Sequence, residues 1–394
     1  MQPLNGIKVI DFSRVLAGPY CTMILADLGA EVVKIEEPAR GDEARGVGPF
    51  LNGVSAYFMS INRGKRSVAL DIKNAKGRDL AAQLTAHADI VVENFRPGTM
   101  ERLGLGYHAL AKINPRLIYA ACSGFGQTGP YRKRGAYDMV IQGMGGIMSI
   151  TGEPGGRPLK TGPAIGDIVG GLFTAIGILA ALQARERTGE GQMVDIGLLD
   201  CQVALLENAI IRYTATGEIP GPLGARHPSI APFEAFEAKD GYVIFAVGTP
   251  HWERFSRILG REELLQDPRF ATNALRAVNH AALQPVIADV AKTKTVQEWI
   301  DVMEKAGVPC GPINRIDQVV ADPQVQARGM IAAVRDPEIG ITRLPGSPLK
   351  LSRTPGRVDR PAPRLGEHTV DILKGWLGLE TKTIDVLKQE QIIA

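Results

Sequence analysis

The sequence predicts an α/β fold, in which a large domain built on an open parallel sheet is followed by a smaller α+β domain. Three observations support this. The chain opens with a strand–helix–strand pattern, strands and helices keep alternating through the first half, and the pattern changes after a Gly- and Pro-rich stretch at residues 214–230. Alternation is typical of parallel sheets, because parallel strands need a crossover between them. At 394 residues the chain is also too long for one ordinary core.

The first βαβ unit lies within the first 36 residues. Residues 6–12, with Ile-Lys-Val-Ile-Asp-Phe after the glycine, predict a buried strand, residues 19–28 have helical periodicity, and residues 31–36 predict a second strand. Ligands bind beyond the carboxyl ends of the strands in such sheets. Residues 13–18 and 36–42 are therefore expected at a ligand-binding edge.

The alternation continues to residue 213. The expected segments are a helix at 75–86, a strand at 89–93, a short helix from Thr99, a strand at 117–122, a helix at 168–183, a strand near Val194 and a helix from 198 to 213. We therefore assign residues 1–213 to the large domain and residues 214–230 to a linker.

The remaining residues have a different character. A hairpin around Lys239-Asp-Gly241 and helices at 252–259, 281–291 and 296–306 predict a small α+β domain at 231–330. Residues 331–394 are expected to form a C-terminal segment that is Pro-rich at 340–365 and helical near 370–377.

Composition excludes several classes of function. The net charge of +3 gives no sign of nucleic-acid binding. The four cysteines form no CxxC pair and the six histidines lack metal-ligand spacing, so we expect reduced thiols, no metal site and a cytoplasmic protein. The N-terminus lacks the zones of a signal peptide, and the longest apolar run, at 168–182, is interrupted by glycines, so no membrane span is expected.

The first βαβ unit raises the possibility of a nicotinamide dinucleotide site. Glu36 ends the second strand, where an acid would bind a ribose. The first turn, Ser13-Arg-Val-Leu-Ala-Gly18, has no G-x-G-x-x-G, so backbone could not approach a pyrophosphate in the usual way. This argues against dinucleotide binding.

Asp167 is the strongest catalytic candidate. It follows a glycine-bearing loop and opens a long apolar helix, where the first turn's unpaired N–H groups point. Because Gly166, Gly170 and Gly171 carry no Cβ, another molecule could approach closely. These features predict an ionised, accessible carboxylate that suits a nucleophile. The alternative is that Asp167 is only the N-cap of the helix.

A set of motifs in order along the chain resembles the family III CoA-transferases, the group that contains formyl-CoA transferase, carnitine CoA-transferase and the 2-methylacyl-CoA racemases. The segments are Asp11-Phe-Ser-Arg-Val-Leu-Ala-Gly-Pro19, Leu28-Gly-Ala-Glu-Val-Val-Lys-Ile-Glu36, Asn62-Arg-Gly-Lys-Arg-Ser67, Leu70-Asp-Ile-Lys73, Glu93-Asn-Phe-Arg-Pro-Gly98, Ser123-Gly-Phe-Gly126, Gly166-Asp-Ile-Val-Gly-Gly171, Val194-Asp-Ile-Gly-Leu-Leu-Asp200, Val308-Pro-Cys-Gly-Pro312 and Leu365-Gly-Glu-His-Thr369.

The resemblance implies an architecture that the residues alone would not predict. The large domain would be Rossmann-like, the C-terminal segment would return to it, and the chain would close into a ring that interlocks with a second copy as a homodimer. Threaded topologies are rare, so this expectation depends on the resemblance.

The resemblance also implies a reaction. Asp167 would attack an acyl-CoA to form an aspartyl–acyl anhydride, and the released CoA thiolate would convert it to an aspartyl-CoA thioester that an acceptor carboxylate then resolves. The enzyme would hold no permanent cofactor. Coenzyme A would be a co-substrate, and the partners would be an acyl-CoA and a small carboxylate.

The family match assigns the coenzyme to residues along the large domain. Arg96 and Arg102 would contact its phosphates, Leu70, Lys73, Asn94 and Phe95 would line the adenine and ribose, Val15 and Ala17 would contact it from the first loop, and Arg40 would replace an arginine that relatives carry near Pro38.

Two positions separate this chain from particular family members. Leu16 stands where formyl-CoA transferase has a glutamine, which argues against a formyl or oxalyl specialist. Tyr137 stands where the racemases have a histidine, and a tyrosine is a poor base at pH 7. Tyr137 favours transfer over racemisation and is expected either to shape the acyl pocket or to be a core aromatic. A racemase-type isomerase stays the alternative.

The acyl acceptor is predicted from the linker. Arg226 and His227 lie together in the loop Gly224-Ala-Arg-His-Pro-Ser229. An arginine there could bind the distal carboxylate of a dicarboxylic acid. We expect a small dicarboxylate acceptor with succinyl-CoA as the donor. The alternative is a surface loop with incidental charge.

Overall fold

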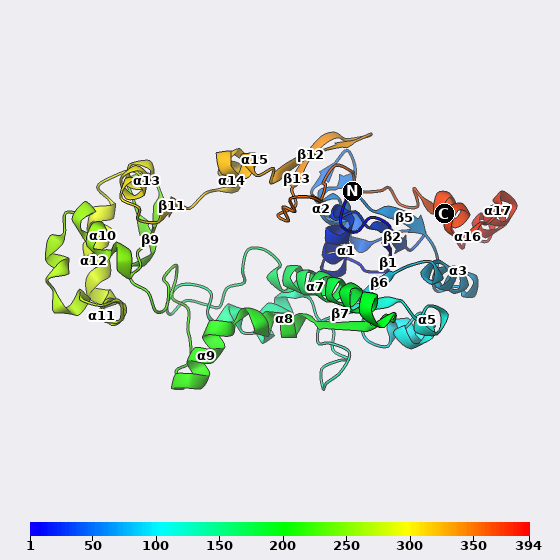
Figure 1. Cartoon of the computed structure of the whole chain (residues 1–394), viewed down its shortest axis with the longest axis horizontal. Coiled ribbons are helices and arrows are strands. Elements are labelled where there is room, and N and C mark those ends of the chain that lie inside the picture. Colours follow the sequence, from blue (N-terminus) through cyan, green and yellow to red (C-terminus); the bar gives the residue numbers. More distant parts are fainter. The chain divides into compact units, whose positions relative to one another are not determined.

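The computed structural model describes residues 1–394, which divide into two compact units (Figure 1). The first unit comprises residues 1–148, 160–217 and 323–394, and the second comprises residues 149–159 and 218–322. Residues 149–159 thus cluster with the second unit, although the sequence placed them in the large domain. The two units are described separately below.

A six-stranded parallel sheet forms the centre of the first unit. The strand order is β5-β2-β1-β6-β7-β8, and every neighbouring pair is parallel. The strands are β1 Lys8–Asp11, β2 Glu31–Glu36, β5 Arg66–Ala69, β6 Ile90–Glu93, β7 Ile118–Ser123 and β8 Met193–Gly197. The parallel sheet and its α/β class confirm the main prediction. Strand β5 was missed, because its four residues include Arg66 and Ser67 and show no apolar run.

Helices cover both faces of this sheet. On one face, α1 (Ala17–Asp27) and α7 (Ile165–Thr188) pack in a core with β1, β6 and β7. On the other face, α3 (Ala75–Ala86) and α16 (Thr369–Leu377) belong to the largest apolar cluster. Sheets covered on both faces bury their strands, and all four residues of β6 are buried, three of them β-branched and apolar.

The other elements of the first unit are shorter. They are β3 Phe50–Leu51, β4 Val54–Ser55, α2 Ala56–Asn62, α4 Thr99–Arg102, α5 Tyr107–Ile113, α6 Asp138–Met144, α8 Leu198–Leu205, α9 Glu207–Thr216, α15 Pro323–Ala327, β12 Ile331–Asp336, β13 Gly340–Pro345 and α17 Thr381–Gln389, with 3₁₀ turns at Glu43–Gly46 and Ile147–Ser149. The single helix expected at 198–213 is thus two helices, α8 and α9.

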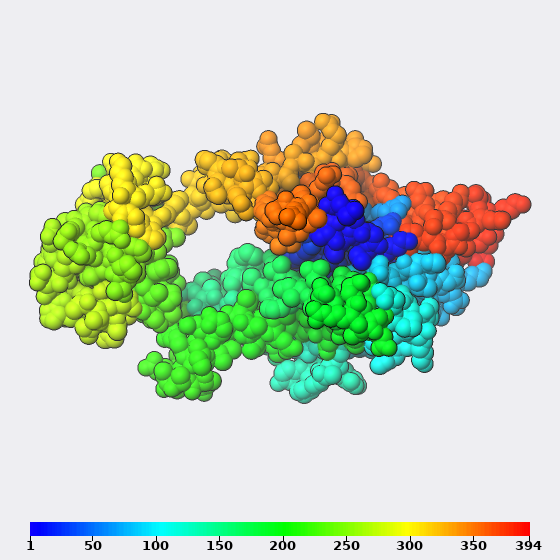
Figure 2. All heavy atoms as spheres, in the orientation of Figure 1, coloured from blue at the N-terminus to red at the C-terminus, as the bar shows by residue number.

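The last residues of the chain dock on strand β5. Thr369 Oγ1 accepts a hydrogen bond from the backbone N–H of Ala69 at 3.0 Å, and the N–H of Gly366 donates to Ser67 Oγ at 2.9 Å. Leu70 forms an isolated β-bridge with Ile393. Figure 2 shows the C-terminal atoms, in red, against the pale blue atoms of this region. These contacts give the Leu365-Gly-Glu-His-Thr369 motif a structural role.

Helix α7 is longer than the sequence suggested. It has 24 residues and, by length and composition alone, is apolar enough to cross a membrane. In the structure it packs against α1, α8, β7 and β8, as a core helix does.

The second unit contains a three-stranded antiparallel sheet of order β11-β10-β9. Its elements are β9 Phe233–Glu237, β10 Tyr242–Ala246, α10 Trp252–Ile258, α11 Asn273–Val278, α12 His280–Ala291, α13 Val296–Lys305, β11 Cys310–Pro312 and α14 Ile316–Ala321, with 3₁₀ turns at Thr249–His251, Glu262–Leu265 and Pro268–Phe270. Phe245 and Trp299 meet edge to face, with ring centroids 5.5 Å apart, in the core of this unit. The expected hairpin at Lys239-Asp-Gly241 is present.

Candidate active site

Asp167 lies inside the first turn of α7. The helix begins at Ile165, with Ala164 as the N-cap, so Asp167 is the third helical residue. The alternative that Asp167 is only the N-cap is therefore wrong. Its side chain is half-buried, and no hydrogen bond or ion pair to it is present.

A second carboxylate, Asp138, accepts hydrogen bonds from N–H groups in the first turn of α7, which were expected to face a ligand. Asp138 lies at the start of α6, and its Oδ1 accepts hydrogen bonds from the backbone N–H groups of Gly166 at 2.8 Å and Asp167 at 3.4 Å. Its Oδ2 accepts one from Gln142 Nε2 at 2.7 Å, and Gln142 Oε1 accepts one from the N–H of Thr161 at 2.9 Å. Asp138 thus caps α7 from a neighbouring helix, and Gln142 ties the preceding loop to it.

The glycines of the Asp167 motif serve helix packing. A Cβ on Gly170 would lie 2.1 Å from Leu198 Cδ2, and one on Gly171 would lie 2.6 Å from the carbonyl oxygen of Ala17. The missing side chains therefore let α8 and α1 approach α7 closely. This corrects the expectation that these glycines leave space for another molecule.

The electrostatic surroundings raise the pKa of Asp167 to about 7, first because the carboxyl is buried and second because Asp138 lies nearby. The Asp167 carboxyl therefore ionises at a higher pH than an ordinary aspartate does. Perturbed groups of this kind are typical of catalytic sites.

We expect the pKa of Asp167 to set the acid limb of the pH profile. Only the carboxylate form can attack, so kcat/KM for an acyl-CoA should rise with pH around a midpoint of about 7. In Asp138→Asn the amide oxygen can still cap α7, but the neighbouring charge is gone, so the midpoint should move to lower pH. It should stay above the ordinary value of 3.8, because burial remains. Measuring both profiles checks this, and an unchanged or higher midpoint in Asp138→Asn would contradict it.

Two tyrosines lie near this region. Tyr57, from α2, is half-buried, and its pKa is raised by burial and then by Asp167, Asp42 and Asp138. Sequence reasoning missed Tyr57, because nothing local in α2 marks it. Tyr137 precedes α6 and is 77% exposed. The alternative that Tyr137 is a core aromatic is therefore wrong.

The loop from β1 to α1 has an unusual backbone. Val15 has φ of +64°, which is rare for a β-branched residue. Its N–H donates to Asp42 Oδ1 at 3.1 Å, and the Asp42 carboxylate pairs with Lys34 at 2.8 Å. Leu16 is buried, and Ala17 starts α1, which has no side-chain cap.

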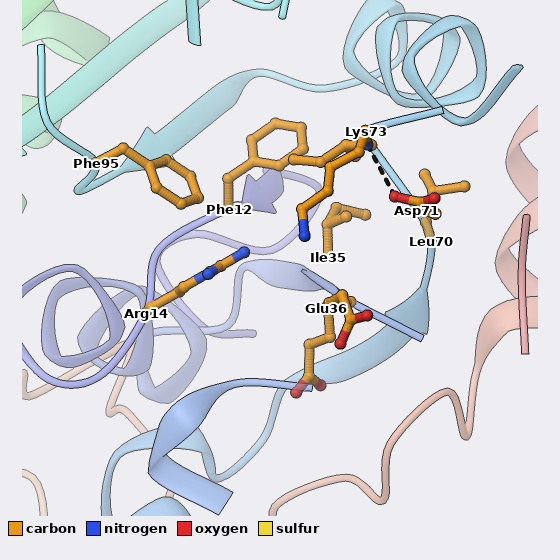
Figure 3. Close-up of a pocket in the computed structure, with 10 residues that line it drawn as sticks. Phe12, Arg14, Ile35, Glu36, Leu70, Asp71, Lys73 and Phe95 are labelled. Carbon is orange, nitrogen blue, oxygen red and sulfur yellow. Dashed lines mark hydrogen bonds between the residues drawn. The ribbon is translucent and has the colours of Figure 1, made fainter. Parts of the chain in front are cut away.

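Three of the residues that the resemblance assigns to coenzyme A line one cleft. Leu70, Lys73 and Phe95 meet there, together with Phe12, Arg14, Ile35 and Glu36 (Figure 3). The other assigned residues lie elsewhere. Asn94 bonds the backbone of Arg14 through both its amide oxygen, at 2.8 Å, and its amide nitrogen, at 2.7 Å. Arg40 is exposed, and its side chain has no hydrogen-bond or ion-pair partner.

The two arginines expected at the phosphates lie near a basic loop. Arg102 lines a second cavity of about 370 Å³ with Arg132 and Lys133. The guanidinium of Arg96 lies against Gly135, where a Cβ would come within 2.7 Å of Arg96 Nη2. The basic residues of this loop were not singled out from the sequence.

The structure rules out the ribose role considered for Glu36. Its Oε2 accepts hydrogen bonds from Arg45 Nε at 2.7 Å and from the N–H of Asp42 at 3.0 Å, and its Oε1 accepts them from Arg45 Nη2 at 2.7 Å and Ser67 Oγ at 2.6 Å. No acceptor position of the Glu36 carboxylate is left for a ribose. The absence of a G-x-G-x-x-G motif in the first turn led to the same conclusion.

In the second unit, the loop of Arg226 and His227 has a defined shape. His227 Nδ1 accepts hydrogen bonds from the N–H groups of Ser229 and Ile230, both at 3.0 Å, and the His227 N–H donates to the carbonyl of Phe233 at 2.9 Å. His227 therefore holds the turn. The guanidinium of Arg226 is partly exposed and has no hydrogen-bond or ion-pair partner.

Comparisons with known proteins agree with this picture. The model of CoA-transferase family III matches residues 4–369. The succinate–glutarate CoA-transferase of Agrobacterium fabrum is 43% identical over 381 residues, covering 94% of this chain and 95% of its own length. The human succinyl-CoA:glutarate CoA-transferase is 38% identical, covering 100% of this chain and 90% of its own length. The acetyl-CoA:oxalate CoA-transferase of Acetobacter aceti is 42% identical, covering 96% of this chain and 97% of its own length.

A solved structure shares the fold. The crystal structure of a CAIB/BAIF family protein from Brucella suis matches with a TM-score of 0.85 and 42% identity, covering 95% of this chain and 99% of that one. Since the family model and these relatives span nearly the whole chain, the protein is an enzyme that belongs to CoA-transferase family III.

Proposed function

We propose that this enzyme transfers coenzyme A from succinyl-CoA to a small dicarboxylate, with Asp167 as the covalent nucleophile. The observation that supports this most is the Asp167 carboxyl itself: it has no partner cation, and its pKa of about 7 makes it both available and reactive near neutral pH. A carboxylate that was paired with arginine or lysine would be a poorer nucleophile.

The reaction balances as two exchanges. A carboxylate oxygen of Asp167 attacks the thioester carbonyl, and the C–S bond breaks to give an aspartyl–acyl anhydride and CoA thiolate. The thiolate attacks the aspartyl carbonyl, which releases the donor acid and leaves an aspartyl-CoA thioester. The acceptor carboxylate attacks this thioester, and the released thiolate then attacks the acceptor's acyl carbonyl. Asp167 is regenerated, and no proton is consumed.

Each tetrahedral intermediate needs donors for its oxyanion. The N–H groups of Gly166 and Asp167 bond Asp138, so they are poor candidates. The N–H groups of Leu16, Ala17 and Gly18, at the uncapped start of α1, form no hydrogen bond. Helix α1 packs directly on α7 at Gly171, one turn from Asp167. We assign the oxyanion donors to this turn.

The dicarboxylate acceptor is inferred from Arg226. Its guanidinium is free, and the hydrogen bonds of His227 keep the turn that carries it in one shape. The relatives named for glutarate and oxalate transfer also support a dicarboxylate. Because Leu16 argues against an oxalyl specialist while an oxalate-transferring relative is 42% identical, oxalate must be tested beside longer acids.

We expect Arg226→Ala to raise KM for the preferred dicarboxylate strongly. Loss of a hydrogen-bonded arginine–carboxylate contact costs about 1.5–3 kcal/mol, which corresponds to a change of roughly 10- to 150-fold. A monocarboxylate of equal chain length should be little affected, and Arg226→Lys should lie between Arg226→Ala and the natural enzyme. Initial rates with glutarate and pentanoate, then with succinate and oxalate, measure this. Better turnover of monocarboxylates by the natural enzyme would contradict the dicarboxylate proposal.

The expected homodimer is a further part of the proposal. Helix α7 exposes Leu172, Phe173 and Ile176 at 37–58%, and a groove of about 600 Å³ runs along it. Apolar surface of this kind supports a second copy as its cover, in line with the interlocked ring that the resemblance implies. Sedimentation analysis would test the dimer. Ring closure and a cytoplasmic location stay predictions.

A further inference from the structure

A network of hydrogen bonds fixes the Asp138 carboxylate against the first turn of α7. Its Oδ1 accepts the N–H groups of Gly166 at 2.8 Å and of Asp167 at 3.4 Å. Gln142 Nε2 donates to its Oδ2 at 2.7 Å. Gln142 is 0% exposed, and its Oε1 accepts the N–H of Thr161 at 2.9 Å. A Cβ on Gly166 would lie 3.1 Å from Asp138 Oδ1, so glycine at this position lets the carboxylate come close. Asp138 is therefore held beside Asp167 by contacts from α6, α7 and the loop that precedes α7.

No cation compensates the Asp138 and Asp167 carboxylates. Helices α1, α6 and α8 and strands β7 and β8 pack on α7, and none of them contains a lysine, an arginine or a histidine. Besides Asp138, Tyr57 of α2 and Cys122 of β7 interact electrostatically with Asp167, and burial raises the pKa of both. Asp138 is therefore the charge that acts most directly on Asp167. The other titratable groups of the packed elements include Tyr20, Cys21, Asp195, Asp200 and Cys201, none of which can carry a positive charge.

Acylation of Asp167 removes one of the two negative charges. Above the pKa of Asp167, its free carboxylate repels the Asp138 carboxylate in a half-buried site. In the aspartyl–acyl anhydride and in the aspartyl-CoA thioester, the same carbonyl group is neutral. When the thioester forms, the negative charge passes to the released donor acid, which leaves the site. The repulsion by Asp138 therefore favours the covalent forms over the free carboxylate, for the same reason that it favours a proton on Asp167.

We propose that the charge of Asp138 shifts the equilibrium of Asp167 from the free carboxylate toward the aspartyl-CoA thioester, and that Gln142 is the positioning residue that holds Asp138 in place for this. The inference deepens the proposed function, on which it rests. The thioester must last long enough for the donor acid to leave and the acceptor acid to enter. A neighbouring anion stabilises it relative to the free carboxylate without contacting either acid, so the effect is the same for every acceptor.

The equilibrium constant of thioester formation tests the proposal. The enzyme is incubated with succinyl-CoA and increasing succinate, without another acceptor, at a pH above the midpoint of its acid limb. The covalent fraction is read from the intact mass after an acid quench. We expect Asp138→Asn to lower the constant by the same factor as it lowers the midpoint, about tenfold for each pH unit, because both changes measure one repulsion. Asp138→Ser also removes the charge and should obey the same relation.

The matched control is Asp240→Asn. Asp240 Oδ1 accepts the N–H of Val296 at 2.7 Å, so this carboxylate also contacts the start of a helix, α13, but it belongs to the second unit. Its neutral variant should keep the natural constant and the natural midpoint. A constant that stays at the natural value in both Asp138 variants would contradict the proposal. If the natural enzyme forms no adduct on Asp167, the proposed function itself fails.

The role of Gln142 is tested by coupling. Gln142→Met should lower the constant and the midpoint in the natural enzyme, because Asp138 loses the hydrogen bond that holds it. In the Asp138→Asn background it should add little, since no charge is left to position. Gln142→Leu takes its place if Gln142→Met does not fold, as judged by urea unfolding. Equal losses in the two backgrounds would show that Gln142 acts independently of Asp138 and would overturn its positioning role.

Discussion

Asp167→Ala is expected to abolish CoA transfer, with a loss in kcat of about 10⁴-fold or more, as for the removal of other covalent nucleophiles. The physical reason is that both the anhydride and the aspartyl-CoA thioester are built on the Asp167 carboxyl. The neighbouring carboxylate, Asp138, cannot replace it, because Asp138 is occupied by the N–H groups of Gly166 and Asp167. The stability of the variant should not fall, because the half-buried carboxyl has no partner to lose.

Trapping gives the direct measurement for Asp167. Incubation of the natural enzyme with succinyl-CoA and then hydroxylamine should yield a hydroxamate on the peptide that contains Asp167, and Asp167→Ala should yield none. An active Asp167→Ala variant, or a turning-over enzyme without the adduct, would contradict the mechanism. Deuterium uptake at Cα of a 2-methylacyl-CoA in heavy water, without an acceptor acid, would instead favour the racemase-type alternative.

Lys65→Met is expected to destabilise the first unit by about 3–5 kcal/mol, as for the loss of one partner from a buried ion pair. Lys65 and Asp11 are both 0% exposed, and their side chains pair at 3.1 Å. The Lys65 ammonium also donates to the carbonyl of Pro19 at 3.0 Å and to Asn62 Oδ1 at 2.8 Å. Burial alone would raise the pKa of Asp11, but Lys65, Lys34 and two hydroxyls lower it to about 2.

The matched control for Lys65 is Lys76→Met. Lys76 pairs with Glu390 at 2.6 Å, but the two side chains are 59% and 39% exposed. An exposed pair contributes about 0–1 kcal/mol, so this variant should unfold in urea near the natural midpoint. The loss of unfolding free energy in Lys65→Met, relative to the natural enzyme, should also be smaller at low pH, because Asp11 can be protonated there once Lys65 is gone. Equal midpoints for the two variants would contradict the importance of the buried pair.

Much of the fold was predictable because it depends on local pattern. The helix expected at 75–86 is α3 (Ala75–Ala86), and the strands β1, β2, β6 and β7 lie within two residues of their predicted places. Each strand is rich in apolar residues, most of them β-branched, and the helix keeps a 3.6-residue period, which are strong signals in a sequence. Strand β5 was missed because its four residues show no apolar run, and helix α17 was missed although Ile384 and Leu387 lie on one face of it.

The candidate site was predictable in part for the same reason. A carboxylate next to a glycine-rich helix start marks Asp167, and a motif marks Lys73 and Phe95 at their cleft. Asp138 and Tyr57 were not found, because their importance comes from which helices α6 and α2 approach.

By itself, the sequence predicted the α/β class, the parallel sheet and the family. It also singled out Asp167 as the catalytic candidate. Each of these depends on residue type and on spacing along the chain. Only the tertiary structure decided the protonation of Asp167, the capping of α7 by Asp138, and the burial of the Lys65–Asp11 and Lys34–Asp42 pairs. The physical reason is that a pKa, a helix cap and a buried ion pair depend on distance and desolvation in space, and residues far apart in the chain set both.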